Sequence, residues 1–251
     1  MMTTPITQRR MEARYAVPLD AVAALAAALP EVATPIELVK GRSAMFVTSL
    51  YLDRPDLSLA RAATLDPTTN EKIRTEESYF HDDSLVPSVW VEWEARRETW
   101  SDKRRFALPK QRFAEFCTGT LGEDAVRLAQ PAGGEVAGVE AFRRVMACGR
   151  GLLLPRFAVT CVRTTYTIHS PRIRLTLHER IRFHLAPPTP YLGHGALSAG
   201  RLGEAFHVLP HAVLDVKSAH ELPSRLRELL QPMSRATVSE FVVGSRHLLS
   251  R

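Results

Sequence analysis

Arginine and lysine side chains alternate along several short segments that read as strands. Lys72 and Arg74 are two residues apart in EKIRTEE, and Lys103 and Arg105 have the same spacing in SDKRRFAL. Side chains two apart on a strand point to the same face of a sheet. Arginine forks and lysine ammonium groups form charge-assisted hydrogen bonds to phosphoryl oxygens. The spacing therefore predicts cationic sheet faces that could hold a phosphate-bearing anion.

The same alternation recurs toward the C-terminus, where Arg172 and Arg174 share a face in PRIRLTLHER and Asp215 and Lys217 share one in HAVLDVK. The residues between them are apolar. For a single strand, a charged face is usually the solvated side of a half-buried sheet. Basic residues recur on several strands, however, which favours strand faces that line the inside of a barrel and bind an anion. Carboxylates on the same faces, such as Asp215, would hold a divalent cation that bridges phosphate oxygens.

The elements that must position these residues are about eight short strands and a few helices. Beside the strand in MEARYA, the expected strand segments are 44–53, 58–65, 71–79, 88–97, 102–109, 156–168, 172–183 and 211–217. Residues 20–29 predict a helix with Asp20 as its N-cap. A second helix opens at Pro109 and ends near Gly119, and two more follow Lys217. The proline- and glycine-rich segment 186–203 predicts a loop.

Strands and helices do not alternate along the chain as they do in proteins with a parallel sheet. The expected fold is therefore α+β, with an antiparallel barrel or a strongly curved sandwich. Apolar helices could cover the outer face of such a barrel and leave the charged face inside. A length of 251 residues fits a single domain over residues 1–251.

Composition limits the partners and the compartment. Lys and Arg total 33 against 27 Asp and Glu, a net charge of +6 that favours anionic partners. Cys117, Cys148 and Cys161 are odd in number and widely spaced, as expected for reduced thiols in a cytoplasmic protein. The most apolar stretch, AVAALAAALP, is too short to span a bilayer. We expect no nucleic-acid partner, because the chain lacks a basic helix and a basic strand interleaved with aromatics.

A series of short motifs follows in a fixed order from about residue 9 to the C-terminus: MEARYAV, TSLYLD, EKIRTE, VEWEARRETWSDKRRF, CVRTTY, RIRLTL, AVLDVK and VSEFVVG. Taken together, they resemble the VTC domain, the polyphosphate polymerase domain of the CYTH-like triphosphate tunnel superfamily. The resemblance implies an antiparallel eight-stranded tunnel barrel covered by a few short helices. It also implies a phosphotransferase that moves the γ-phosphate of ATP onto a polyphosphate chain with Mn²⁺ or Mg²⁺.

The resemblance assigns roles residue by residue. The implied phosphate-binding residues are Arg14, Lys72, Arg74, Arg96, Lys103, Arg105, Arg163, Arg174 and Lys217, of which Arg74, Lys103, Arg174 and Lys217 are the implied catalytic residues. Asp215 stands where the family has a metal-binding Glu, and Glu12 and Glu92 are implied helpers at the metal.

Several positions depart from the family pattern. Glu94 and Glu240 fall where similar proteins carry Lys, His178 falls where an Asp is common, and Cys161 falls where a Tyr is common. The two glutamates remove positive charge from a phosphate path. Three functions therefore stay open: polyphosphate synthesis from ATP, tripolyphosphate hydrolysis by the same fold, and non-catalytic sensing of polyphosphate or a nucleotide. A separate membrane protein that receives the product is a further candidate partner.

Overall fold

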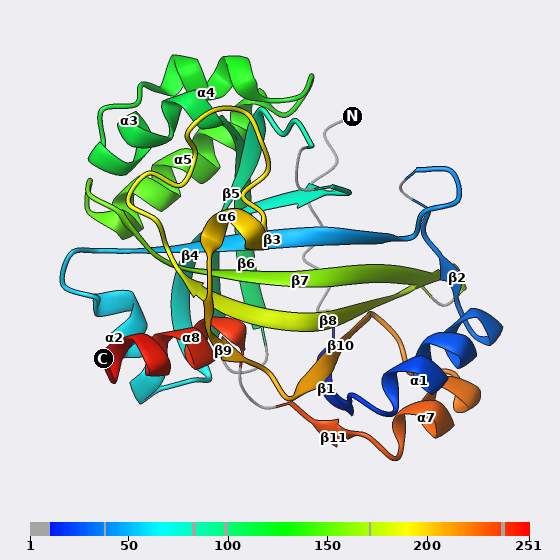
Figure 1. Cartoon of the computed structure of the whole chain (residues 1–251). Coiled ribbons are helices and arrows are strands. Elements are labelled where there is room, and N and C mark those ends of the chain that lie inside the picture. The colour runs from blue at the N-terminus through cyan, green and yellow to red at the C-terminus, as the bar shows by residue number, and fades with distance from the viewer. Residues whose placement is uncertain (1–10, 38, 82–83, 98–99, 171, 237–238) are drawn as a thin grey trace. The chain divides into compact units, whose positions relative to one another are not determined.

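The computed structural model describes residues 11–37, 39–81, 84–97, 100–170, 172–236 and 239–251 (Figure 1). Within these ranges the strands are β1 (Met11–Pro18), β2 (Thr34–Pro35), β3 (Ala44–Asp53), β4 (Thr69–Tyr79), β5 (Ser88–Arg97), β6 (Trp100–Pro109), β7 (Leu154–Ile168), β8 (Ile173–Leu185), β9 (Ala205–Val208), β10 (His211–Ser218) and β11 (Ser234–Arg235). The helices are α1 (Val22–Ala28), η1 (Leu29–Glu31), α2 (Ser58–Leu65), η2 (Lys110–Arg112), α3 (Phe113–Thr118), α4 (Glu123–Ala129), α5 (Glu135–Gly149), α6 (Ala199–Leu202), α7 (Ser224–Leu230) and α8 (Glu240–Leu249).

The described residues form eleven strands, whereas the sequence predicted about eight. Eight of those in the described ranges have eight residues or more, whereas β2, β9 and β11 have two to four. The pairings with a defined register are antiparallel. The antiparallel α+β class is therefore confirmed, and the short strands are additions to the eight long ones.

The predicted strand at 58–65 is wrong, because this segment forms α2. Leu59, Ala60 and Ala63 are buried at helical spacing, and alanine and leucine favour helices. The Asp53 carboxylate accepts the backbone N–H groups of Leu59 and Ala60 at 3.0 and 2.8 Å. This acceptor from the preceding strand satisfies donors that the first helical turn leaves unpaired.

Other helix predictions need smaller corrections. Asp20 is not the N-cap of the first helix, since Ala21 holds that position without a side-chain cap. Gly119 does end α3, with a left-handed φ of 74°. Helices α4 and α5 were not predicted from the sequence, and α5 has 15 residues, which is longer than the short helices expected. No helix in the described ranges is long and apolar enough to cross a membrane.

The chain divides into two compact units. Unit 1 contains Met1–Ala44, Val162–Arg180 and Leu209–Thr237, and unit 2 contains Met45–Cys161, Ile181–Val208 and Val238–Arg251. Strands β7 and β8 contribute residues to both. The expectation of a single domain over residues 1–251 stays a prediction.

Unit 1 is built on the strand order β11-β1-β10-β8, with β2 paired to β7. One face of these strands is apolar and buries residues such as Tyr15, Leu175 and Leu214. Leu25 of α1 and Leu226 of α7 belong to the same buried cluster. The two helices lie next to each other in Figure 1. They therefore cover the apolar face of unit 1, and the opposite face carries the charged residues.

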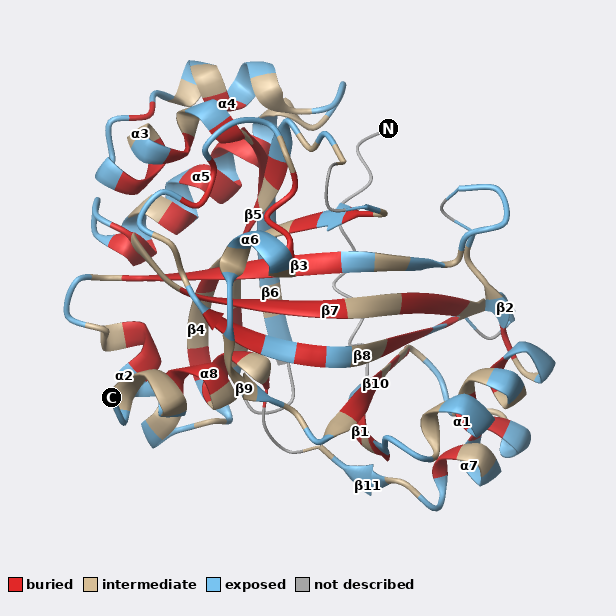
Figure 2. Ribbon diagram, viewed as in Figure 1, coloured by how far each residue is buried: buried red, intermediate tan, exposed pale blue. Residues whose placement is uncertain are grey.

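Unit 2 is built on the strand order β3-β4-β5-β6, with β9 paired to β8. Its apolar face packs under α3, α4 and α5, where Phe106 lies 5.8 Å from Phe116 and 5.6 Å from Phe142 between ring centroids. The buried residues gather on the strands, and exposed residues lie on the outer turns of α3 and α4 (Figure 2). As in unit 1, helices cover the apolar face.

The loop at 186–203 is confirmed in outline, with only the four-residue α6 inside it. It is anchored by a fully buried ion pair, in which Lys110 Nζ lies 2.5 Å from Glu77 Oε2 and both side chains have zero exposure. Lys110 also donates to the carbonyl of Gly195, and Glu77 accepts the N–H of Leu197. Burial raises the pKa of Glu77 and lowers that of Lys110. The sequence analysis did not single out this pair.

Candidate phosphate-binding faces

The strand register of unit 2 gathers charged residues on the face opposite the helices. Arg74 is paired with Tyr51 on β3 and with Glu92 on β5, and Glu92 is paired with Arg105 on β6. Directly paired residues share a face of the sheet. We call this the unit 2 face; its charged members are Lys72, Arg74, Glu76, Glu92, Glu94, Arg96, Lys103 and Arg105.

Arg74 is the hub of the unit 2 face. Its Nε and Nη2 donate to Glu92 Oε2 at 2.9 and 2.8 Å, and Nη2 also lies 2.9 Å from Glu76 Oε2. Its Nη1 is 3.3 Å from Ser49 Oγ. Burial acts to lower the pKa of Arg74, but the carboxylates of Glu76 and Glu92 raise it well above its ordinary value. Arg74 is therefore permanently charged and held on several sides.

Glu92 joins Arg74 to Lys103. Lys103 Nζ lies 2.7 Å from Glu92 Oε2, the same oxygen that receives Arg74. Only 3% of the Glu92 side chain is exposed, against 41% for Lys103. Burial acts to raise the pKa of Glu92, yet Arg74 and Lys103 hold it below its ordinary value. The carboxylate is thus ionised, and its Oε2 is engaged by two cations.

Glu94, the first departure from the family pattern, neutralises Lys72 across the strand pair. Lys72 Nζ lies 3.1 Å from Glu94 Oε1. Burial acts to raise the pKa of Glu94, but Lys72, Arg74 and Lys103 lower it to about 2. Only 12% of the Lys72 side chain is exposed, which leaves it less access to an anion than Lys103 has while it keeps this contact.

Helix α8 covers one end of the unit 2 face. Phe241 stacks on Tyr51 with ring centroids 5.3 Å apart, and Phe157 stacks on Tyr51 at 4.8 Å. Burial raises the pKa of Tyr51, and the charge of Glu240 in the first turn of α8 acts in the same direction. Tyr51 therefore stays protonated. The second departure from the family pattern, Glu240, acts electrostatically on this same end of the face.

The remaining predicted cations of unit 2 have different environments. The guanidinium of Arg105 lies 4.6 Å from the centroid of the Trp90 ring, a cation–π contact. Arg96 is half-buried on β5, paired with Asn70 and Ser101 in the register. Arg96 shares the parity of Glu92 and Glu94 on β5, and Arg105 is paired with Glu92, so both lie on the unit 2 face.

Unit 1 carries a second charged face, formed by β1, β10 and β8. Arg14 Nε donates to Asp215 Oδ1 at 2.7 Å, and Lys217 Nζ donates to Glu12 Oε1 at 2.8 Å. In the register Lys217 is paired with both Glu12 and Arg174. Arg174 is exposed. We call the residues Glu12, Arg14, Arg174, Thr176, His178, Asp215 and Lys217 the unit 1 face.

Other predicted residues lie on or near the unit 1 face. His178 Nε2 is 3.7 Å from Asp215 Oδ2, so a second basic group approaches this carboxylate where the family has an acid. Arg163 is a half-buried residue of β7 in the same unit.

The predicted metal ligands fit only a partial metal site. Asp215 and Glu12 lie on neighbouring strands, and each already faces a cation. Across the described residues, no group of three or more His, Cys, Asp or Glu side chains could hold a metal ion. Mg²⁺ is commonly held by one or two carboxylates together with substrate phosphates and water. Asp215 and Glu12 suit that arrangement, whereas the carboxylate of Glu92 is occupied by Arg74 and Lys103.

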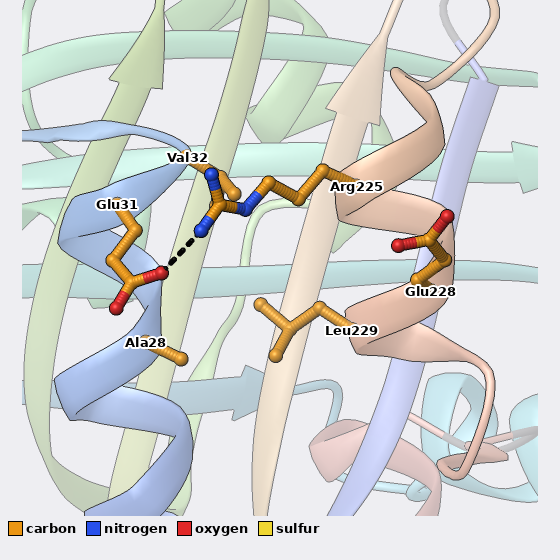
Figure 3. Close-up of a pocket in the computed structure, with 6 residues that line it drawn as sticks. All are labelled: Ala28, Glu31, Val32, Arg225, Glu228 and Leu229. Atoms are coloured by element: carbon orange, nitrogen blue, oxygen red, sulfur yellow. Dashed lines mark hydrogen bonds and ion pairs between the residues drawn. The ribbon is translucent and has the colours of Figure 1, made fainter.

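A pocket of about 240 Å³ lies among the helices that cover the apolar face of unit 1. It is lined by Ala28, Glu31, Val32, Arg225, Glu228 and Leu229. Figure 3 shows Arg225 reaching from α7 to Glu31 of η1, at 2.6 Å. These helices cover the apolar face of unit 1, so the pocket is not part of the unit 1 face.

The structure thus brings the predicted residues together in two sets, one in each unit. It adds Glu76 and Ser49 to the unit 2 face, neither of which the sequence analysis assigned to a site. Glu76 could have been found from its parity, because it lies two residues after Arg74 on the same strand. Ser49 carries no such signal, since its hydroxyl is recognised only once β3 is paired with β4.

The fold is similar to that of several solved structures. A protein from Hippeastrum, described as a candidate adenylyl cyclase with a dominant triphosphatase activity, has a TM-score of 0.54 and 13% identity over 95% of this chain and 96% of that one. A candidate adenylate cyclase from Bacillus halodurans has a TM-score of 0.49 and 10% identity, over 93% and 95% of the two chains. A protein from Pyrococcus horikoshii OT3 has a TM-score of 0.46 and 9% identity, over 96% and 99%. No curated protein matches the chain.

The antiparallel sheet and its covering helices, a fold similar to that of the Hippeastrum protein, confirm the predicted fold class, an antiparallel α+β sheet covered by helices. The family model of the VTC domain matches residues 9–249. The chain therefore belongs to the VTC domain family, as its motifs indicated.

Proposed function

We propose that this domain binds triphosphate and polyphosphate through the unit 1 and unit 2 faces and transfers the γ-phosphate of ATP onto a polyphosphate chain. The observation that supports this most is the placement of the predicted cations. In each unit they lie on the sheet face opposite the helix-covered core, in a chain matched to the VTC family over residues 9–249. A face that keeps cations away from the core is suited to a polyanion.

The protein would contribute positioning and charge neutralisation instead of a covalent nucleophile. Arg174 and Lys217 would contact the transferring phosphates on the unit 1 face, and Lys103 would contact phosphate on the unit 2 face. A terminal phosphate oxygen of the acceptor chain attacks the γ-phosphorus, the bond from this phosphorus to the β–γ bridging oxygen breaks, and ADP leaves. The supporting phosphate contacts are assigned to Arg14, Lys72, Arg96, Arg105 and Arg163. The guanidinium of Arg74 is enclosed by carboxylates, and we assign it to holding the unit 2 face together.

A divalent cation, Mn²⁺ or Mg²⁺, would be held by Asp215 with Glu12 and would neutralise charge on the phosphate oxygens when bound. Each of these carboxylates would then exchange its present partner, Arg14 or Lys217, for the metal. The released cations would become available to the phosphates.

Two alternatives use the same faces. If water attacks in place of the acceptor chain, the domain is a tripolyphosphatase, which is supported by the triphosphatase activity described for the Hippeastrum protein of similar fold. If neither attack occurs, the domain is a sensor of polyphosphate or a nucleotide. The pairing of Lys72 with Glu94 favours this second alternative, because it removes one free positive charge.

The test is to incubate the purified protein with ATP and Mn²⁺ and to measure polyphosphate and ADP, with tripolyphosphate and Mn²⁺ in a parallel reaction. Polymer with matching ADP is the expected result. Release of phosphate from tripolyphosphate without polymer would identify the hydrolase, and binding without turnover would identify the sensor. Absence of binding to any phosphate chain would overturn all three. A cytoplasmic location and a membrane protein that receives the product stay predictions.

A further inference from the structure

Glu92 has an arrangement that none of the proposed phosphate and metal roles explains. One of its oxygens, Oε2, receives Arg74 Nε, Arg74 Nη2 and Lys103 Nζ at 2.9, 2.8 and 2.7 Å. The side chain is almost fully buried. A buried carboxylate with two cationic partners is well compensated, and removing either partner would be costly. Glu92 is therefore a fixed point of the unit 2 face.

Arg74 has little capacity left for a phosphate. A guanidinium has five N–H donors in a rigid fork. Its Nε edge is used by Glu92, Nη2 is shared between Glu92 and Glu76, and Nη1 approaches Ser49. Binding a phosphate in the same fork would require the displacement of the buried carboxylate of Glu92.

Lys103 has the opposite character. An ammonium group has three donors, and the ion pair with Glu92 uses one direction of approach. Two-fifths of the side chain remains exposed. Lys103 can therefore reach an anion while it keeps its contact with Glu92, which Arg74 cannot do.

We propose that Glu92 is a positioning residue that, fixed by Arg74, holds Lys103 in place as the phosphate-contacting cation at the centre of the unit 2 face. This inference rests on the proposed phosphate binding and deepens it. Burial and the nearby charge of Arg74 lower the pKa of Lys103, and Glu92 opposes that shift. Glu92 therefore keeps Lys103 protonated as well as in place.

A variant that removes the negative charge of Glu92 tests the inference, because the charge change alone and the loss of positioning predict opposite effects on anion binding. Glu92→Gln removes a negative charge from the face, so simple electrostatics predicts tighter binding of an anion. We expect about tenfold weaker binding of inorganic tripolyphosphate in metal-free buffer, because the charge-assisted contact of Lys103 is lost. Glu94→Gln is the matched comparison: it makes the same charge change two residues along the same strand, and because it frees Lys72 from its carboxylate, we expect tighter binding.

A double-mutant cycle identifies the path of the effect. Lys103→Gln should weaken tripolyphosphate binding about tenfold. If Glu92 acts through Lys103, Glu92→Gln in the Lys103→Gln background should cause no further weakening. The pH profile gives a second readout. Binding depends on the Lys103 ammonium and falls as pH rises, and this fall should occur at lower pH in Glu92→Gln, because the carboxylate that favours the ammonium is gone.

The outcomes separate this inference from the proposed function. If wild type does not bind tripolyphosphate, phosphate binding itself is wrong. If wild type binds, the inference is overturned when Glu92→Gln binds as tightly as Glu94→Gln, or when it weakens binding equally in the Lys103→Gln background. Circular dichroism checks that each variant is folded. If Glu92→Gln does not fold, Glu92→Asp keeps the charge but withdraws the oxygen from Lys103; weaker binding supports the inference, and binding equal to wild type overturns it.

Discussion

The two units present cations on the face opposite their cores, but they pair these cations in different ways. In unit 1 the pair of Lys217 with Glu12 is open to solvent, with side chains that are 40% and 42% exposed. In unit 2 the pairs interlock, because a single buried carboxylate, that of Glu92, serves both Arg74 and Lys103.

A cationic face can therefore hold its charges in ion pairs that change partners easily, or in a network that keeps a fixed geometry. An exposed pair gains little from its contact, since water and salt screen both charges, so either group can change partner at low cost. A buried network costs several kcal/mol to break, because the charge left behind has no water around it. We therefore expect unit 1 to bind anions by exchanging partners, and unit 2 to keep its geometry.

The largest expected effect is on the buried pair of unit 2. Lys110→Met leaves Glu77 without its cation at a site of zero exposure, and we expect a loss of about 3–5 kcal/mol in the free energy of unfolding. Lys217→Met in unit 1 breaks an exposed pair and should cost about 0–1 kcal/mol. Urea denaturation measures both, and equal losses would contradict the contrast between the units.

A smaller effect is expected at the hub of the unit 2 face. Arg74→Leu leaves Glu92 and Glu76 facing each other, and we expect a loss of about 2–3 kcal/mol, because part of this cluster reaches solvent. Arg14→Leu, the matched change in unit 1, should cost about 1 kcal/mol. The same denaturation experiment compares them, and a larger loss for Arg14→Leu would reverse the assignment of the rigid face.

Exchange in unit 1 can be tested through binding. Arg174 is exposed and makes no ion pair with the residues that the structure describes, so Arg174→Gln should leave stability within about 0.5 kcal/mol of wild type. We expect the same change to weaken tripolyphosphate binding about tenfold, by loss of one charge-assisted contact. Calorimetric titration at two salt concentrations measures this. Unchanged affinity would remove Arg174 from the phosphate site.

The smallest expected effect is the response to acid. The pKa of Glu94 is lowered from 4.5 to about 2, so its ion pair stabilises the fold fully above pH 4.5. This contribution is lost as pH falls from 4.5 toward 2, and we expect about 1 kcal/mol of it to be lost between pH 7 and pH 4. Thermal unfolding of wild type and Glu94→Gln across this range measures it. The difference between the two proteins should shrink at low pH, and a constant difference would show that Glu94 does not stabilise the fold through its charge.

The eight long strands were predictable because turn residues and period-two alternation repeat along the chain. The error at 58–65 has a physical cause: SLARAATL is short and apolar, and only the carboxylate of Asp53 at its N-terminus, together with burial against β4 and α8, decides for a helix. No element was predicted for the segment that forms α5, although its apolar residues recur at helical spacing, as at Val139, Phe142 and Val145.

The sequence by itself determined which residues share a face, since strand parity depends only on spacing. It therefore placed Arg74 with Lys72, and Lys103 with Arg105, before any pairing was known. Only the tertiary structure decided the partners, because an ion pair depends on register between strands far apart in the sequence. For this reason Glu92, which was predicted to assist metal binding, instead forms ion pairs with two cations. For the same reason, the buried pair of Lys110 with Glu77 left no signal in the sequence.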